Sequence, residues 1–233
     1  RLVPQDPSDE PAEQILRRPG KLLLTDENFH NLPKGWCWST MSEIAFVTGG
    51  ITKGRNLIGK KTVKLPYLRV ANVQRGWLDL KEIKEIDVLV SEVDKYKLVY
   101  NDLVLTEGGD RDKLGRSAIW REQIPTCVHQ NHIFKARLKT TEILPEWLMY
   151  YTNSEQGQSY FLKAAKQTTN LASINMTQLR ACPIPLPPYS EQKRIIAEIE
   201  RRLSLAAEVE KAVETALARA ERQRQAILKQ AFE

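Results

Sequence analysis

The chain has 233 residues, 42% of them apolar and 27% charged, and a formal net charge of +6, a composition typical of a soluble protein with a buried core. No apolar run approaches the ~20 residues that cross a bilayer, and the acidic, proline-rich start is unlike a signal peptide, so we expect a cytoplasmic location and no membrane partner. Cys37, Cys127 and Cys182 are odd in number and widely spaced, which excludes a disulfide framework and a zinc pattern.

Residues 1–30 are predicted to form a linker with one short helix. Pro4, Pro7 and Pro11 bracket acidic residues there, and AEQILRR is the only run with helical spacing. The turn signal NLPKG at residues 31–35 then opens a globular domain, which we expect to span residues 31–188.

Alternating β-branched and aromatic residues predict several strands within that domain. They are expected around residues 36–38, 64–73, 98–106, 115–120 and 126–138. Residues 144–166 have helical spacing, with a break predicted near Gly157. Strands and helices do not alternate regularly, so we predict a mixed α+β fold with a twisted β-sheet and flanking helices.

Positive charge is concentrated in two stretches of the domain. Residues 44–78 and 156–190 contain no acidic residue. The lysines and arginines there are interleaved with Thr, Asn and Gln. This composition suits a polyanion, because cations neutralise phosphates while amides and hydroxyls read base edges. The alternative is a set of solvated loops without a ligand.

The C-terminal part is predicted to be one long helix over residues 189–233. The prolines of PIPLPP (183–188) cannot continue a helix, Ser190 suits an N-terminus, and neither Gly nor Pro follows. Apolar residues then recur at steps of four and three, as in a coiled-coil seam: Ile195, Ile199, Ala206, Val209, Val213, Ala216, Ala220 and Ile227. A second stripe beside the seam consists of Ile196, Leu203, Leu217 and Leu228. We expect two helical partners. The alternative is an amphipathic helix folded back on its own domain.

Two enzyme motifs are present only in part. GRNLIGK (54–60) has the first seven positions of a phosphate-binding loop, but Lys61 replaces the Ser or Thr that would bind magnesium. LPPY (186–189) has a leucine where the catalytic tetrapeptide of amino-methyltransferases needs a hydrogen-bond acceptor. Neither motif therefore predicts catalysis.

Titratable residues give no better prediction of a reaction. Cys127, His129 and His132 supply only three metal ligands at strand-like spacing. Glu107 and Asp110 lie beside cations, where ion pairing is favoured over acid–base work. We therefore predict no catalytic residue, no metal site and no cofactor.

Seven further segments are informative when they are taken together. They are TGGITKG (48–54), LPYLRVANVQRGWLDL (65–80), DLVLTEGG (102–109), LGRSAIW (114–120), TTNLASIN (168–175), PIPLPPYSEQKRIIAEIE (183–200) and ILKQAFE (227–233). With these segments the chain resembles one protein family, the specificity subunits of type I restriction-modification systems. The resemblance covers nearly the whole chain. Its most specific parts are TTNLASIN and the junction between the prolines and the helix.

The resemblance implies a target-recognition domain over residues 31–188 and a spacer helix over residues 189–233. Subunits of this family usually have two such domains and two antiparallel spacer helices, which set the distance between two half-sites on DNA. This chain resembles one half of such a subunit. The implied partners are double-stranded DNA, modification subunits that methylate adenine, a restriction or motor subunit within the assembled complex, and a second spacer helix from the other half or another copy. The chain itself would be a non-catalytic DNA reader.

Candidate DNA contacts come from the basic stretches and from loops between the predicted strands. They are Thr52, Lys53, Arg55, Asn56, Lys60, Lys61, Arg69, Asn72, Arg75, Arg111, Lys113, Arg116, Gln130, Asn131, Lys166, Thr168, Thr169 and Asn170. The amides at positions 130 and 131 suit adenine edges. Two rival functions remain: a coiled-coil scaffold that binds protein without reading DNA, and an ATP-dependent enzyme that uses the loop at Gly54.

Overall fold

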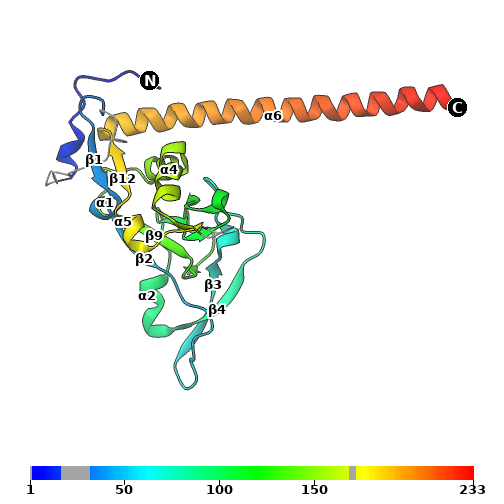
Figure 1. The fold of residues 1–233 in the computed structure, drawn as a ribbon. Coiled ribbons are helices and arrows are strands. Elements are labelled where there is room, and N and C mark those ends of the chain that lie inside the picture. The colour runs from blue at the N-terminus through cyan, green and yellow to red at the C-terminus, as the bar shows by residue number, and fades with distance from the viewer. Residues whose placement is uncertain (1, 17–31, 168–171) are drawn as a thin grey trace. The chain divides into compact units, whose positions relative to one another are not determined.

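The computed structural model describes residues 2–16, 32–167 and 172–233, without the side chains of Arg111 and Gln167. The chain divides into two compact units. One unit spans Ser8–Gln192 and contains the strands, and the other consists of Lys193–Glu233 with the N-terminal residues up to Pro7. Figure 1 traces the short strands and helices of the first unit and the long helix α6. The mixed α+β class is confirmed.

The strands of the described residues form four small sheets. The largest has the order β2-β9-β5-β7, and all its pairs are antiparallel. Its strands are β2 (Ala45–Gly49), β9 (Ile133–Leu138), β5 (Leu103–Thr106) and β7 (Ser117–Ile119). Every residue of β5 and β7 is buried, so this sheet forms the centre of the unit.

A second sheet positions the first basic stretch. It has the order β4-β3-β8, with β4 (Lys84–Leu89), β3 (Thr62–Leu68) and β8 (Val128–His129). β3 and β4 pair from Thr62 opposite Leu89 to Tyr67 opposite Lys84. The loop of residues 52–61, between β2 and β3, therefore lies at the Thr62 end of this hairpin, at the bottom of Figure 1.

The two remaining sheets join segments that are far apart in the sequence. One has the order β10-β11-β6, with β10 (Lys166–Gln167), β11 (Ala172–Ser173) and β6 (Gly108–Gly109). The other pairs β1 (Cys37–Thr40) with β12 (Pro183–Leu186). The proline-rich run is thus a strand as well as a boundary. A two-stranded sheet tolerates proline, because each strand has an edge that needs no ladder donor.

The helices of the first unit are short. They are α1 (Met41–Ile44), α2 (Val93–Tyr96), α3 (Pro145–Asn153), α4 (Glu155–Ala164) and α5 (Met176–Arg180), with 3-10 turns η1 (Ala12–Gln14), η2 (Val70–Asn72), η3 (Val90–Glu92) and η4 (Arg111–Lys113). The helix predicted over residues 144–166 is broken at Ser154, three residues before Gly157, where the break was predicted. Ser154 is extended, and its hydroxyl accepts a hydrogen bond from the Gly157 amide, which caps α4.

Two apolar clusters stabilise the first unit. The larger contains Leu68, Val73, Leu98, Val104, Ala118, Trp120, Cys127 and Ile133. The smaller contains Ile51, Leu65, Tyr67, Val88 and Val128. Neighbouring residues of a strand point to opposite faces, so Tyr67 and Leu68 enter different clusters. The end of β3 is therefore buried on both faces, which fixes the position of the segment that follows it.

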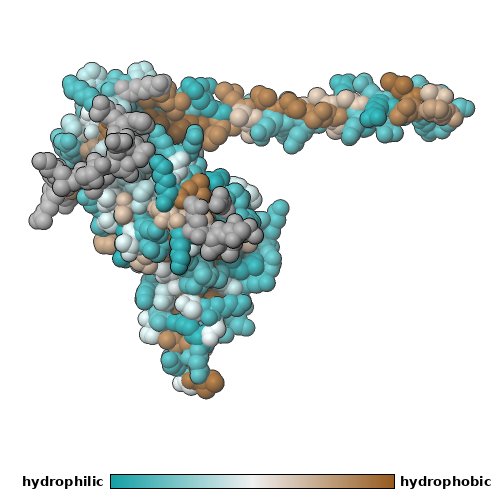
Figure 2. Space-filling view, in the orientation of Figure 1, coloured by the Kyte–Doolittle hydropathy of each residue, from teal (hydrophilic) through white to brown (hydrophobic). Residues whose placement is uncertain are grey.

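The long C-terminal helix is continuous, as predicted. α6 (Tyr189–Phe232) has 44 residues and begins one residue before Ser190. Every residue after Glu200 is exposed, and Figure 2 shows apolar side chains along this helix. Among the described residues, no helix combines the length and hydrophobicity that a membrane span requires.

Candidate nucleic-acid interface

The loop of residues 52–61 presents a group of exposed cations. Lys53, Lys60 and Lys61 are exposed, and no described carboxylate forms an ion pair with them. Thr52 is exposed as well, directly after the buried Ile51. No acidic residue occurs in the sequence on either side, from residue 44 to residue 78. The positive charge of this loop is therefore available to a ligand.

Arg55 and Asn56 stabilise the conformation of the 52–61 loop. Arg55 Nη1 donates to Glu92 Oε2 at 2.7 Å, and both side chains are only about a quarter exposed. Asn56 Oδ1 accepts a hydrogen bond from the Ile58 amide at 3.1 Å. The structure thus gives Arg55 an internal partner 37 residues away, which no local pattern in the sequence indicates.

Arg69 and Asn72 fix the segment after β3. Asn72 is buried, its Oδ1 accepts from the Arg69 amide at 2.8 Å, and its Nδ2 donates to the carbonyls of Asp79 and Glu82 at 2.8 and 3.1 Å. Arg69 Nη2 donates to the Glu82 carbonyl at 3.0 Å. The amide of Asn72 is occupied by backbone groups, so we assign it a structural role in place of base contact.

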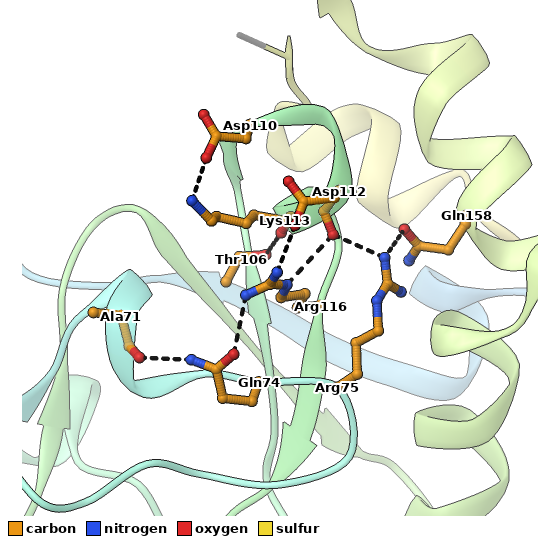
Figure 3. A network of polar contacts seen from close by, with 9 residues as sticks. All are labelled: Ala71, Gln74, Arg75, Thr106, Asp110, Asp112, Lys113, Arg116 and Gln158. Carbon is orange, nitrogen blue, oxygen red and sulfur yellow. Dashed lines mark hydrogen bonds and ion pairs between the residues drawn. The ribbon is translucent and has the colours of Figure 1, made fainter. Parts of the chain in front are cut away.

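Arg75, Lys113 and Arg116 come together in one polar network (Figure 3). Arg116 Nη2 donates to Asp112 Oδ2 at 2.7 Å, and its Nη1 donates to Gln74 Oε1 at 3.0 Å. Arg75 Nη2 donates to the Asp112 carbonyl at 2.8 Å. Lys113 pairs with Asp110. The two basic segments that the sequence treats separately, around residues 75 and 113, therefore form one surface.

Three side chains of this network were not predicted from the sequence. Gln158 Oε1, on α4, accepts from Arg75 Nη2 at 2.9 Å, and Gln74 Nε2 donates to the Ala71 carbonyl at 2.8 Å. Asp112 is four residues before Arg116, a spacing that does indicate an ion pair. Gln158 has no such signal, because it lies 83 residues from its partner. Burial lowers the pKa of Arg75, and the neighbouring charge of Arg116 lowers it further.

Gln130 and Asn131 lie next to the start of the 52–61 loop. The Asn131 amide donates to the Ile51 carbonyl at 2.9 Å, and Ile51 and Gln130 form a parallel bridge. Both side chains are partly exposed. His132 Nδ1 lies 2.5 Å from Glu107 Oε2, which links the same turn to the segment before β6. The structure therefore brings residues 51–53, 130–132 and 107 into one neighbourhood.

The remaining candidates are near the β10-β11-β6 sheet. Lys166 is exposed at the start of β10. β11 pairs with β6, so this segment adjoins the loop that contains Lys113. Thr168, Thr169, Asn170 and the Arg111 side chain lie outside the described residues. Their predicted contacts remain predictions.

The residues considered for metal or nucleotide binding are engaged elsewhere. Buried Cys127 donates to the Val128 carbonyl at 3.4 Å, and burial raises its pKa to about 12. His129 Nδ1 lies 2.9 Å from the Ile133 carbonyl. In the described part of the chain, no group of three or more His, Cys, Asp or Glu side chains is placed to hold a metal. The Gly54 loop leads into strand β3, whereas a phosphate-binding loop opens a helix.

Comparison with known proteins assigns the family. A family model described as "Type I restriction modification DNA specificity domain" matches residues 33–218. The chain belongs to this specificity family. The match spans most of the first unit and the first part of α6.

Curated specificity subunits are similar to this chain at low identity. The putative MjaX specificity subunit of Methanocaldococcus jannaschii is 26% identical over 177 residues, which cover 73% of this chain and 41% of the relative. The EcoKI specificity subunit of Escherichia coli K12 is 28% identical over 188 residues, which cover 78% of this chain and 40% of the relative. The chain thus spans less than half the length of these specificity subunits.

Solved structures support the same fold. A chain from a structure on assembly and conformational transition of the type I R-M system matches with a TM-score of 0.63 and 21% identity, covering 89% of this chain and 48% of that one. The HsdS subunit of Thermoanaerobacter tengcongensis matches with a TM-score of 0.51 and 20% identity, covering 78% and 41%. The fold of this chain is therefore shared with parts of these structures at low sequence identity.

Proposed function

We propose that this specificity subunit reads one half of a bipartite DNA target and docks modification subunits on it. Residues 31–188 act as the target-recognition domain, and residues 189–233 act as the spacer helix. The observation that carries the proposal is the set of exposed lysines in the 52–61 loop, Lys53, Lys60 and Lys61, without carboxylate partners among the described residues. Such cations are suited to neutralise phosphates.

The polar network around Arg75 supports readout as well as affinity. Gln74 Oε1 accepts a hydrogen bond from Arg116, and Gln158 Oε1 accepts one from Arg75, so both guanidinium groups are held in fixed places. A preorganised guanidinium is suited to bidentate contact with guanine or with phosphate. The partly exposed amides of Gln130 and Asn131 add donors and acceptors that suit adenine.

Assembly is assigned to α6. Val209, Val213 and Ile227 of the predicted seam are 63%, 52% and 65% exposed, and Leu203 and Leu217 of the second stripe are 55% and 64% exposed. Exposed apolar stripes on a long helix favour pairing with other helices. We propose a second spacer helix on one stripe and modification subunits on the other. Methylation and cleavage belong to the modification and restriction subunits.

Binding of the complex with its modification subunits to target DNA tests this function. Neutralising Lys53, Lys60 and Lys61 together to Gln should lower affinity and reduce the slope of log K against log salt by ~0.9 for each lost phosphate contact. The matched control is Lys139→Gln, an exposed lysine beside Ile44, at the other end of β2 from the loop. If the triple variant binds DNA as the wild type does, with the same salt slope, the loop is not part of the interface. If the wild-type complex binds no DNA, the protein-binding scaffold is favoured instead.

A further inference from the structure

The tip of the 52–61 loop is a tight turn that presents one apolar side chain. The Lys60 amide donates to the Leu57 carbonyl at 3.1 Å, which closes a four-residue turn. Gly59 has φ +73°, the left-handed conformation that the third position of a type II turn requires. Ile58 occupies the second position, at the outer corner. Of the exposed large apolar side chains in the described chain, it is the most open, at 90%.

The turn is held from several sides, so the exposure of Ile58 follows from defined geometry. Asn56 Oδ1 accepts from the Ile58 amide at 3.1 Å. Arg55 pairs with Glu92 of η3 at 2.7 Å, and the Val90 amide donates to the Lys61 carbonyl at 3.1 Å. Both ends of the loop are thereby attached to the segment after β4. Because these contacts already order the loop, Ile58 can contact a ligand without a further loss of conformational entropy in the loop.

The surroundings of Ile58 indicate which ligand it meets. A single exposed isoleucine is ordinary on a protein surface. This one is flanked by the exposed Lys53, Lys60 and Lys61, in a stretch with no acidic residue. Figure 2 shows apolar atoms at the lower tip of the molecule, with hydrophilic atoms beside them. An apolar side chain in a loop that also carries exposed cations complements a duplex groove, where phosphates line the rim and stacked bases form the floor.

We propose that Ile58 acts as an apolar wedge, which enters a groove of the target duplex and partly unstacks one base step. Lys53, Lys60 and Lys61 hold the phosphates on either side. Partial unstacking by an inserted aliphatic side chain kinks DNA and increases the surface that the protein contacts. This inference rests on the proposed DNA-reading function and adds a deformation of the target to it.

The experiment measures DNA bending in the complex with modification subunits. A target duplex carries fluorophores at its two ends, and energy transfer reports the bend. Ile58→Ala should reduce the bend and weaken binding to intact target about 10-fold. A target with one mismatched base pair, scanned across the half-site, should restore binding of the variant at the step where the wedge acts. The salt slope should stay unchanged, because no charge is lost.

Matched variants separate the wedge from general effects. Phe46→Ala removes another exposed apolar side chain, 62% exposed on β2, and should leave bend and affinity unchanged. The triple lysine variant should lower the salt slope and keep the bend of the DNA that it still binds. Thermal unfolding of Ile58→Ala should match the wild type, because the removed side chain contacts almost nothing.

Three results would overturn the wedge. The first is an Ile58→Ala complex that bends and binds intact target as the wild type does. The second is an Ile58→Ala variant that loses modification subunits during size-exclusion chromatography, while the complex that remains bends DNA as the wild type does. In that case Ile58 contacts protein and not DNA. The third is a wild-type complex that binds DNA with a normal salt slope but leaves it straight. This last result leaves the proposed DNA-reading function intact.

Discussion

Arg75 and Arg116 donate to the same acceptor, the carbonyl oxygen of Asp112, at 2.8 and 3.4 Å. Two guanidinium groups are thus held close together, although like charges repel. The carboxylate of Asp112 reduces this repulsion, since Arg116 also pairs with it at 2.7 Å. Arg116 has most of its side chain buried and bonds to protein partners, whereas Arg75 is exposed. We therefore propose that Arg75 contacts the DNA and that Arg116 helps to position Arg75.

This relationship predicts different effects for the two arginines. Arg75→Gln should weaken DNA binding and reduce the salt slope by ~0.9, the value for one phosphate contact. Arg116→Lys keeps the positive charge, but a lysine cannot bond to Gln74 and Asp112 at the same time, as the guanidinium does. We therefore expect weaker binding to target DNA and an unchanged salt slope. Titrations of target and non-target DNA at several salt concentrations measure both effects. Target binding by Arg116→Lys equal to the wild type would remove the positioning role.

The ion pair between buried Asp102 and partly exposed Arg137, at the start of β5, predicts a large loss of stability. Asp102 is fully buried and accepts from Arg137 Nε and Nη2 at 2.7 and 2.8 Å, and from the Val99 amide at 2.8 Å. Asp102→Ala should lower the free energy of unfolding by about 3 kcal/mol, because it leaves donors without their acceptor. Glu82→Gln, in an exposed pair with Lys84, is the control and should change the free energy of unfolding far less, because solvent screens exposed ion pairs. Equal effects in urea titrations would contradict this assignment.

His129 predicts a loss of stability at mildly acidic pH. Burial lowers its pKa from 6.5 to about 4. Above pH ~6.5 the imidazole is neutral in both folded and unfolded chains, so it has no effect on stability. Between pH 6.5 and 4 the His129 imidazole is protonated in the unfolded chain but stays neutral in the folded chain. Stability is therefore lost as the pH falls. The loss should approach about 3 kcal/mol at pH 4.

His129→Leu isolates this contribution. The variant loses the hydrogen bond to the Ile133 carbonyl, so it should be less stable than the wild type at pH 7. Its stability should then fall less between pH 6.5 and 4, because the titrating group is gone. Urea titrations at a series of pH values give the difference in slope. An identical slope in both proteins would assign the acid loss to carboxylates.

The first turn of α6 predicts where the recognition domain can be cut. Gln192 is fully buried, its Oε1 accepts from the Leu144 amide at 2.9 Å, and its Nε2 donates to the Pro187 carbonyl at 3.1 Å. Trp36 Nε1 donates to Glu191 Oε2 at 3.0 Å. A chain ending at residue 188 should therefore unfold at a lower urea concentration than one ending at residue 200.

Single substitutions refine that comparison. Gln192→Ala should lower the free energy of unfolding by about 1–3 kcal/mol, because it leaves buried backbone groups without partners. Gln223→Ala, on the exposed part of α6, should stay within ~0.5 kcal/mol of the wild type. If the chains ending at residues 188 and 200 were equally stable, the domain would end at the prolines.

Local patterns in the sequence were sufficient to predict the long helix and several of the strands. The absence of Gly and Pro after Pro188 predicted the 44-residue helix to within one residue of its start. Alternation predicted strands where β3, β5, β7 and β9 lie. The family resemblance rested on the same segments, and the family model confirms it.

Long-range pairing was not predictable from spacing alone. The strand role of residues 183–186 depends on a partner more than 140 residues away, and one chain without relatives contains no signal for that pairing. Tertiary packing turns the Asn72 amide inward and pairs Arg55 with Glu92. Such packing determines which polar side chains of a basic stretch stay accessible to a ligand, and the sequence pattern does not show it. Ile58 was overlooked because charge patterns ignore apolar residues.

The antiparallel pairing of β1 with β12 places Thr40 opposite Pro183 and Cys37 opposite Leu186. The segment between Thr40 and Pro183 therefore leaves and rejoins the chain at neighbouring points. Such a segment can be exchanged as a cassette between related proteins, because the junctions stay together whatever loops lie between them. Under the proposed function, such an exchange would change the DNA target while the pairing of β1 with β12 stays the same.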